Sequence, residues 1–482
     1  MAQDAVATDT AAHAKEWLSG LACSMSREHD YYPTIEGRLP AALQGTLYRN
    51  GPGRFEFGGA RKTHLLDGDG MIQAFDIHNG RVRYRNRFVR TEKFLAEERA
   101  GRLMLPTWTA RAPGGVLRNI GNRIKSQAGV TTLVKNSRLL AFDEVGLPYG
   151  LDPQTLATIG LQQVGPPDVH PDYKAHTKTD PETGNWLVLG VENGARQRLH
   201  LVEHAADGTL LRHHRIDSPR QSYIHDWFAT ERYVLVLLHP LRVSMGRFLS
   251  GLSSFTDSMR WEPGKGNLLV VIDRNAAAEP VTIETSACFM WHSLNAFEAG
   301  DSIIADFVGY DEPDHFMGED AAFRAIMYGR QGLQECSGTV RRYVVKLRQK
   351  QIIEQVLSDE NHEFPVLDPR KALHRHRFGY FTTGPPGTVF HNGLARLNVD
   401  TGQRDVATLG DCVHLGEPIF VPDREASDEQ GWLLSVGLDG GSGRSFLGIF
   451  RSERLADGLL AKVLLEHPTP LSFHGWWSGL SV

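Results

Sequence analysis

Residues 71–90 read MIQAFDIHNGRVRYRNRFVR, in which two segments of alternating apolar and polar residues flank an Asn-Gly pair. Alternation with a period of two is typical of a strand that buries one face. An Asn-Gly pair between two such segments is the strongest short-range signal of a β-hairpin. We therefore expect two antiparallel strands joined by a tight turn.

The same strand–turn–strand pattern recurs along the chain, and no alternation of strands with helices accompanies it. It is found at 176–192, 226–238, 295–310, 394–410 and 431–450. An all-β fold is predicted. Tandem sandwiches and one closed β-propeller both fit many hairpins, and a propeller leaves no long free edge. Seven four-stranded blades would have roughly 69 residues each, although the repeats are too dissimilar to give the count.

The domain organisation follows from the lack of any linker rich in Pro, Gly or Ser. We expect an N-terminal extension over residues 1–30 and one β-propeller catalytic domain over residues 31–482. Three stretches richer in helix or loop are predicted to be insertions that cap one face over the active site. They lie at about 94–125, 241–261 and 312–333.

Composition and charge exclude several classes of protein. Of the 482 residues, 41% are hydrophobic and 23% charged, which excludes a disordered chain, a coiled coil and a collagen-like repeat. The 52 basic and 57 acidic residues give a net charge of −5, so no nucleic-acid partner is expected. With no signal peptide, no apolar run of membrane-spanning length and no C-x-x-C pair, we expect a cytoplasmic protein without an obligate protein partner.

One segment qualifies this expectation. Residues 111–125 read RAPGGVLRNIGNRIK, with Val116, Ile120 and Ile124 at helical spacing and basic residues between them. The pattern is that of a short helix lying on an anionic membrane surface, here the inner membrane surface. An ordinary amphipathic helix packed on the body of the protein fits it equally well.

Three histidines stand at similar places in different strand–turn–strand units. His176 and His225 each precede a turn by four residues, and His292 precedes one by six. In a radial fold such positions converge on the axis. Three imidazoles at one point would repel one another if charged and would leave N–H donors unsatisfied if neutral, and a bound metal ion removes both problems. His474, in PLSFHGWW, is a fourth candidate. Unbound buried histidines are common, however, and the pattern alone selects no metal.

Three glutamates stand in apolar or proline-bound surroundings that suit a solvated carboxylate poorly. They are Glu144, Glu363 and Glu417. Each could simply cap a loop N–H. Because a metal-bound histidine usually donates its other N–H to a carboxylate or carbonyl, the three together favour a buried cationic centre.

The chain resembles the carotenoid cleavage oxygenases over essentially its whole length. The resemblance lies in LYRNGPG at 47–53, LDGDGM at 66–71 and FHGWW at 473–477, and in KAHTK, YIHDW, WHSLNAFE, EFPVLDPR and GEPIFVP between them. It implies a seven-bladed β-propeller with Fe(II) on its axis. The implied iron ligands are His176, His225, His292 and His474, and the implied catalytic glutamates, which orient three of those imidazoles, are Glu144, Glu363 and Glu417.

The reaction that the resemblance implies is oxidative cleavage of one C=C bond by O₂ into two carbonyl products. No organic cofactor is expected, because no G-x-G-x-x-G after a strand and no P-loop occur. Many relatives carry Asn-Thr before the strand that leads to the first glutamate, where the Thr shapes the O₂ pocket. Here that stretch reads Gly-Val-Thr-Thr from residue 129, so Val130 or Thr131 takes its place.

The sequence fits two substrate classes and one non-catalytic role. An apocarotenoid is favoured, because 111–125 resembles the membrane-dipping entrance of apocarotenoid-cleaving members. A stilbenoid or phenylpropanoid is the alternative, but Asp143 stands where that branch has a Lys. A propeller that only binds ligands is the third reading. Phe94, Phe307 and Phe364 are candidates for the tunnel wall, and core packing fits each of them at least as well; which double bond is cleaved, or whether one is isomerised, is not fixed.

Overall fold

The hairpin at residues 71–90 forms as predicted. In the computed structural model, which describes residues 17–479 except 122, 333, 425, 427 and 428, it consists of β6 (Asp69–His78) and β7 (Arg81–Phe88). Asn79 and Gly80 both have positive φ, of 50° and 70°. This matches the requirement of a two-residue turn that follows the twist of the strands.

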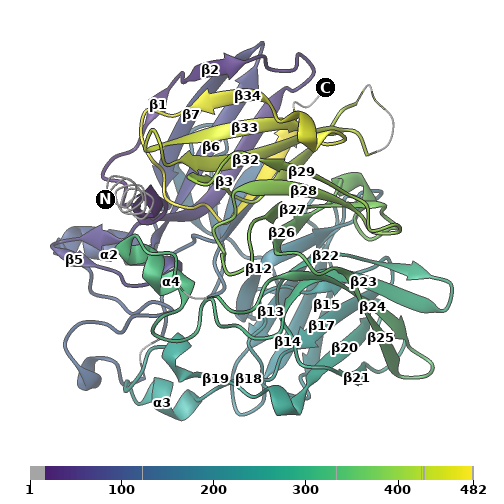
Figure 1. Ribbon diagram of the computed structural model, residues 1–482. Coiled ribbons are helices and arrows are strands. Elements are labelled where there is room, and N and C mark those ends of the chain that lie inside the picture. Colours follow the sequence, from purple (N-terminus) through teal and green to yellow (C-terminus); the bar gives the residue numbers. More distant parts are fainter. Residues whose placement is uncertain (1–16, 122, 333, 425, 427–428, 480–482) are drawn as a thin grey trace, which may run out of the picture.

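Within the described residues, seven antiparallel sheets of four or more strands surround a common axis (Figure 1). The prediction of a seven-bladed β-propeller is confirmed. Six of these sheets follow one another along the chain. The first contains β8 (Thr131–Lys135), β9 (Arg138–Phe142), β10 (Tyr149–Leu151) and β11 (Thr158–Leu161), the second β12 (Asp172–Thr179), β13 (Trp186–Glu192), β14 (Arg198–His204) and β15 (Leu210–Asp217), and the third β16 (Phe228–Ala229), β17 (Tyr233–Leu238), β20 (Asn267–Asp273) and β21 (Val281–Thr285). The fourth contains β22 (Phe289–Ala299), β23 (Ser302–Tyr310), β24 (Thr339–Lys346) and β25 (Gln351–Ser358), the fifth β26 (His362–Val366), β27 (Phe378–Thr383), β28 (Gly393–Asn398) and β29 (Arg404–Thr408), and the sixth β30 (Val413–Leu415), β31 (Ile419–Pro422), β32 (Gly431–Asp439), β33 (Arg444–Arg451), β34 (Leu459–Leu464) and β2 (Thr34–Gly37).

The ring is closed by strands from the two ends of the chain. The seventh sheet runs β35 (His474–Gly479), β3 (Gly45–Arg54), β6, β7 and β1 (Asp30–Tyr31). β35 pairs with β3 from Asn50↔His474 to Gly45↔Gly479, and β2 pairs with β34. The early purple strands and the late yellow strands accordingly lie side by side in Figure 1. This closure rules out tandem sandwiches.

The core lies between neighbouring sheets. One cluster joins Phe75 and Leu47 of the closing sheet to Trp432 and Leu447 of the next. Another joins Leu189 on β13 to Val236 and its neighbours on β17. Each sheet therefore buries both faces against its neighbours, which fixes the inner strands around the axis.

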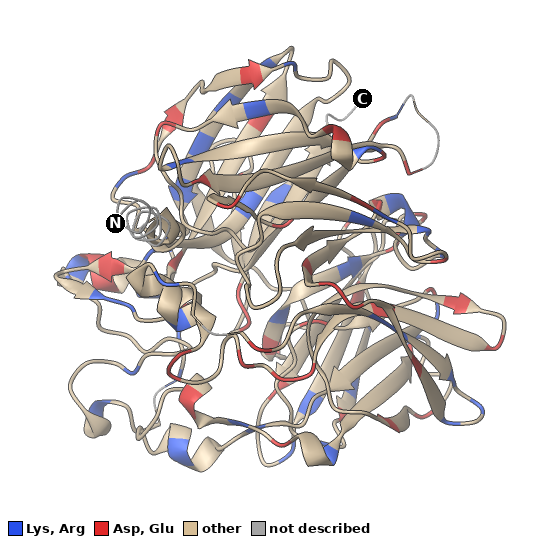
Figure 2. Cartoon of the chain, viewed as in Figure 1, with Lys and Arg blue, Asp and Glu red and all other residues tan. Residues whose placement is uncertain are grey.

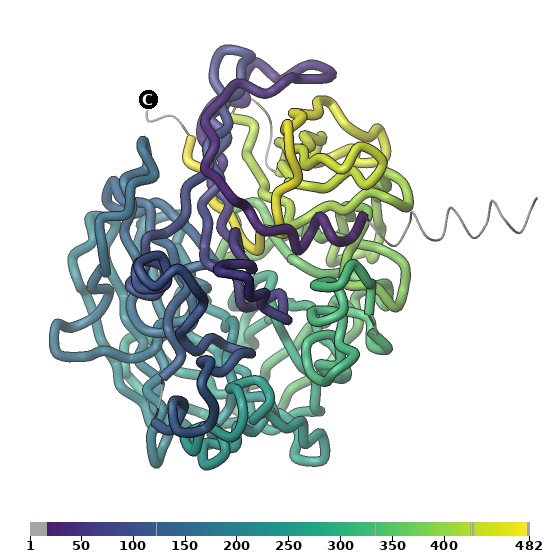
Figure 3. The backbone as a smooth tube through the Cα atoms, turned by 90° about the vertical axis from the view of Figure 1, so that its left-hand side faces the viewer, coloured from purple at the N-terminus to yellow at the C-terminus, as the bar shows by residue number. Residues whose placement is uncertain are grey.

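The predicted insertions gather on one side of the ring (Figures 1 and 3). They contain α2 (Glu92–Ala100), α3 (Met245–Leu249), α4 (Ala322–Ala325), the hairpin β18 (Leu241–Val243) and β19 (Met259–Trp261), and the 3₁₀ turns η3 (Val116–Arg118), η4 (Thr256–Ser258) and η6 (Ile326–Tyr328). An ion pair of 2.8 Å between Arg324 and Asp257 joins two of them. The remaining short elements are the hairpin β4 (Glu56–Phe57) and β5 (Ala60–Arg61), and the turns η1 (Trp17–Ala22), η2 (Leu65–Asp67), η5 (Pro263–Lys265), η7 (Pro369–Lys371) and η8 (Leu455–Asp457).

The helix predicted within residues 111–125 does not form: its described residues contain only the single turn η3. Gly114, Gly115 and Gly121 have positive φ, which a right-handed helix does not tolerate. The Asn119 side chain instead bonds the N–H and C=O of Ala112 at 2.8 and 2.9 Å and closes a loop.

Residues 1–16 of the expected N-terminal extension lie outside the described residues. The turn η1 that follows buries Leu18 and Leu21 against Phe55 and Leu65. No helix among those described has the length and apolar character needed to cross a membrane.

Candidate metal centre

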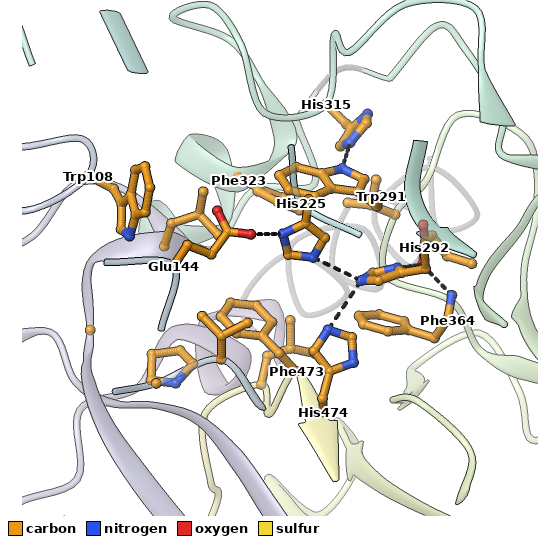
Figure 4. A pocket seen from close by; sticks show the side chains of 18 of the residues that line it. Trp108, Glu144, His225, Trp291, His292, His315, Phe323, Phe364, Phe473 and His474 are labelled. Atoms are coloured by element: carbon orange, nitrogen blue, oxygen red, sulfur yellow. Dashed lines mark hydrogen bonds and ion pairs between the residues drawn. The ribbon is translucent and has the colours of Figure 1, made fainter. Parts of the chain in front are cut away.

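Four histidines from four different sheets meet on the axis (Figure 4 labels three of them). His176 lies on β12, His225 just before β16, His292 on β22, and His474 at the start of β35. Their Nε2 atoms are 3.1 Å apart for His176 and His225, 3.3 Å for His225 and His292, and 3.1 Å for His292 and His474. The structure thus brings all four predicted ligand residues together.

Irregular pairing of the inner strands aims these side chains at the axis. The register of β12 shifts between Tyr173 and Thr177, around His176, and that of β22 shifts between Met290 and Ser293, around His292. A shift of this kind re-aims a side chain that regular alternation would direct to a sheet face.

The three predicted glutamates each contact one of these imidazoles. Glu144 bonds Nδ1 of His225, Glu363 bonds Nδ1 of His292 at 2.6 Å, and Glu417 bonds Nδ1 of His474 at 2.8 Å. Because a carboxylate accepts from Nδ1–H, the Nε2 lone pair of each ring faces the axis. His176 has no such partner among the described carboxylates.

The carboxylates are held in the charged form by further contacts. Burial raises the pKa of Glu144, but Lys174 and His225 together with the Tyr223 hydroxyl, 2.7 Å away, lower it to about 2. Arg49 donates to Glu417 at 2.5 Å and is itself fully buried. Removal of either cationic partner would leave a buried charge uncompensated.

Two of the four imidazoles, those of His176 and His474, favour the neutral form, whereas burial lowers the pKa of His292 but the Glu363 carboxylate raises it above its usual value. Burial and the neighbouring rings hold the pKa of His176 well below its usual range. Burial also lowers the pKa of His474 to about 4, against the opposing effect of Glu417. Four imidazole nitrogens that converge on one point suit a borderline transition metal and not the oxygen-seeking Mg²⁺ or Ca²⁺. The residues therefore fit a bound metal ion.

An ion-pair network ties three of the ligand strands together. Lys178 Nζ donates to Asp226 at 2.8 Å and to Ser293 Oγ at 2.8 Å. Asp226 also accepts from the Ser293 N–H at 2.8 Å and from its hydroxyl at 2.7 Å. These residues follow His176, His225 and His292 by one or two positions. Sequence reasoning did not single them out, although they stand in the motifs KAHTK, YIHDW and WHSLN.

Two cavities reach the cluster. The cap-side cavity is mostly apolar and is lined by Pro52, Leu66, Trp108, Val130, Tyr223, Trp291, Phe323, Phe364, Phe390, Leu471 and Phe473, among others (Figure 4). A second cavity, of about 510 Å³, lies among the inner strands and is lined by His176, Lys178, Asp226 and Ser293, among others. Both cavities are mostly apolar, and the second also contains the charged groups of the Lys178–Asp226 pair.

Only part of the predicted tunnel wall is confirmed. Phe364 lines both cavities. Phe94 instead packs in a core cluster with Met71, and Phe307 packs against Tyr343, so these two predictions are wrong. Phe94 lies on the buried face of helix α2 and Phe307 on a buried strand, β23, and local sequence does not reveal what covers either side chain.

Val130 and Thr131, the two candidates for the place that a Thr takes in many relatives, differ in their surroundings. Val130 lines the cap-side cavity, whereas Thr131 is buried away from its lining. Asp143 lines it too and accepts from the indole N–H of Trp108 at 3.1 Å and from the Gln127 N–H at 2.7 Å. Burial raises the pKa of Asp143.

Comparison with known proteins decides the family. The family model described as RPE65, retinal pigment epithelial membrane protein, matches residues 23–479. The chain belongs to the RPE65/carotenoid oxygenase family. The family members that resemble this chain are named oxygenases, and this protein is accordingly an oxygenase.

The relatives act on more than one substrate class, to judge from their names. The apocarotenoid-15,15'-oxygenase of Synechocystis is 29% identical, with 96% of each chain covered. An isoeugenol monooxygenase of Pseudomonas nitroreducens is 26% identical, covering 92% of this family member and 93% of that protein. A resveratrol cleavage oxygenase of Aspergillus fumigatus is 27% identical, covering 92% and 91%.

The solved structures agree with the fold. The crystal structure of cobalt-substituted Synechocystis apocarotenoid oxygenase has a TM-score of 0.90 at 29% identity, with 97% of this family member and 99% of that chain covered. The propeller of this carotenoid oxygenase family member is therefore shared over nearly its full length.

Proposed function

We propose that this oxygenase uses Fe(II) and O₂ to cleave one C=C bond of an apocarotenoid-like polyene into two carbonyl products. The observation that carries the proposal is the cluster of four imidazoles, three of them held by carboxylates, at the wall of an apolar cavity. The reaction is balanced, since one C=C and one O₂ give two C=O groups. Bound iron would supply O₂ activation beside the double bond.

The metal would be held by the four histidines of the axis, and Glu144, Glu363 and Glu417 would act as positioning residues. The solved structure of a cobalt-substituted relative with the same fold supports a replaceable metal in this protein. Imidazole donors alone do not select iron over other divalent metals. The choice of iron rests on the resemblance to carotenoid cleavage oxygenases, and the ferrous state on the need to react with O₂.

The cavity residues would bind the polyene and exclude water. Trp291 and Phe364 lie next to His225 and His292, with ring centroids 4.7 and 5.2 Å from the respective imidazoles (Figure 4). An extended apolar chain gains about 0.8 kcal/mol for each CH₂ moved from water into such a lining. A dry lining also keeps water from competing with O₂.

The substrate class is argued from two observations. The relative named apocarotenoid-15,15'-oxygenase covers more of the chain than the isoeugenol and resveratrol enzymes do. Asp143, already committed to Trp108 and Gln127, stands where stilbene-cleaving members carry Lys. The second candidate is a stilbenoid or phenylpropanoid, which the two other named relatives favour.

We also propose peripheral membrane contact of a cytoplasmic protein through the cap. Leu117 is 86% exposed and Ile120 is 57% exposed, and the 249–252 turn beside them exposes Leu249 and Leu252. The Gly121 N–H bonds the Leu249 carbonyl at 2.8 Å, so both segments form one apolar patch. An apolar patch with basic neighbours favours an anionic bilayer surface.

The proposal is tested by incubating the iron-loaded protein under ¹⁸O₂ with a panel of polyenes and hydroxystilbenes. Mass spectrometry is expected to show two labelled carbonyl fragments from an apocarotenoid. Cleavage of the stilbenes alone would replace the substrate class. A product of unchanged mass and altered geometry would indicate isomerisation instead.

A further inference from the structure

One buried histidine of the cap-side cavity has a role that the four-histidine cluster does not explain. His414, on β30, lines this cavity with Phe390 and Phe473 and is only 3% exposed. Among the described residues, neither of its ring nitrogens makes a hydrogen bond. The His391 carbonyl oxygen, which accepts from the Leu415 N–H at 2.9 Å, lies near the ring and raises its pKa, but neither ring nitrogen meets the geometry of a hydrogen bond to it.

Asp143 and His315, two other polar groups of the cavity, differ from His414 because each has at least one partner. Asp143 is bonded to Trp108 and Gln127, and His315, whose Nδ1 has no partner, accepts from the Trp291 indole at its other nitrogen. Burial and the neighbouring His391 ring lower the pKa of His414 to about 3, so its ring is neutral. A neutral imidazole offers one donor and one acceptor, and buried polar groups of this kind normally have partners. The missing partner is expected to come from a ligand.

We propose that His414 is a specificity residue that hydrogen-bonds a terminal hydroxyl or carbonyl oxygen of the substrate. The inference rests on the proposed function, in which this cavity holds the polyene. Because the rest of the lining is largely apolar, one polar contact would fix one end of the chain. The number of carbons from that end would then set which double bond lies at the histidine cluster.

The test measures binding to metal-free protein, so turnover does not interfere. The ligands are an apocarotenal, the matching apocarotenol and a hydrocarbon polyene of equal length. Quenching of the fluorescence of Trp108 and Trp291, which line the cavity, reports binding. The native protein is expected to bind the oxygenated ligands about 5- to 10-fold more tightly than the hydrocarbon, as a single neutral hydrogen bond would give.

Two variants and one control separate the outcomes. His414→Phe is expected to abolish the preference while hydrocarbon binding stays within about 2-fold, and His414→Gln, which keeps a donor and an acceptor, is expected to retain part of it. If His414→Phe does not fold, His414→Leu replaces it. His204→Phe is the control, because His204 is a buried histidine with an unpartnered Nδ1 outside the cavity lining.

Equal weakening of all three ligands by His414→Phe would overturn the proposal, as would an unchanged preference. Failure of the proposed function is distinguishable. If no polyene is cleaved by the iron-loaded protein but the preference is present and His414 controls it, only the oxygenase reaction on polyenes fails. If polyenes are cleaved and His414→Phe leaves both preference and cleavage position unchanged, only the role of His414 fails.

Discussion

The Nδ1 of His292 donates to Oε2 of Glu363 at 2.6 Å, and this bond joins β22 to β26, inner strands of neighbouring sheets. Phe364, next to Glu363, has a positive φ of 50° at a shift in the register of β26. The backbone irregularity and the carboxylate bond together fix how one imidazole faces the axis.

Glu363→Gln is expected to weaken metal binding about 10- to 100-fold, because an amide neither raises the basicity of the imidazole nor holds its tautomer as firmly. Competition with a chelator of known affinity measures the change. Glu192→Gln is the matched control. Glu192 also bonds a histidine, with 3.0 Å between its carboxylate and Nε2 of His200, but this histidine is not part of the four-histidine cluster. Equal metal affinity in the two variants would contradict the positioning role.

Metal addition to the metal-free protein is expected to raise its thermal midpoint. At a free Co²⁺ or Fe²⁺ concentration of 100 times Kd, the gain in unfolding free energy is about 2.7 kcal/mol. His292→Ala is expected to remove the gain, and His204→Ala to leave it intact. A gain that survives His292→Ala would place the metal elsewhere.

Asp226→Asn probes the network that ties the ligand strands together. The variant leaves Lys178 facing an amide, and breaking such a pair costs about 3–5 kcal/mol when it is buried, less here because the Lys178 side chain is 18% exposed. We expect a changed visible spectrum of the Co²⁺-loaded protein together with weaker metal binding. Asp306→Asn disrupts a buried pair with Arg342 instead and is expected to lower stability without altering the spectrum.

The proposed membrane contact would be made by exposed apolar side chains of the cap, Leu117 and Ile120 among them. Leu117→Ser combined with Ile120→Ser is expected to lower binding to anionic vesicles several-fold in a sedimentation assay, because the apolar area that enters the bilayer falls. Val356→Ser is a control, as Val356 is 62% exposed on the outer strand β25. Equal loss in both variants would argue against a specific patch.

Stability is expected to fall as the pH falls from about 6.5 toward 4. Burial lowers the pKa of His64 and His391 to about 4 and that of His362 to about 3. Because the unfolded chain takes up these protons near pH 6.5 and the folded chain does not, each residue reduces the unfolding free energy by up to about 1.4 kcal/mol per pH unit. Denaturant titrations of His362→Phe should show a shallower dependence than the native protein; equal slopes would contradict the assignment.

The hairpins were predictable because each depends on contacts within some twenty residues. Asn79 and Gly80 carry the turn conformation in their own chemistry. His176, His225 and His292 were also predictable, since equivalent places in repeated units become neighbours in a ring, and the resemblance to the carotenoid cleavage oxygenases added His474. Residues 111–125 were not, because three glycines and the Asn119 side chain outweigh the apolar spacing.

Contacts between distant segments of the chain could not be predicted from the sequence. Phe94 and Phe307 resemble Phe364 in sequence terms, yet only Phe364 faces a cavity. His414 stands three residues before Glu417, and no local pattern tells that its ring lacks partners. These properties depend on which distant segments pack against a residue, and the residues next to it in the sequence do not determine that packing.

The pairing of β35 with β3 has a consequence for how the protein matures. His176, His225 and His292 are synthesised well before His474, which arrives on the strand that completes the ring. A nascent chain that has emerged only as far as residue 400 would offer a cation at most three of the four nitrogens, with the first and last sheets still unjoined. A metal ion held by all four histidines would therefore bind only after β35 has paired with β3, and its presence would indicate that the ring of sheets is closed.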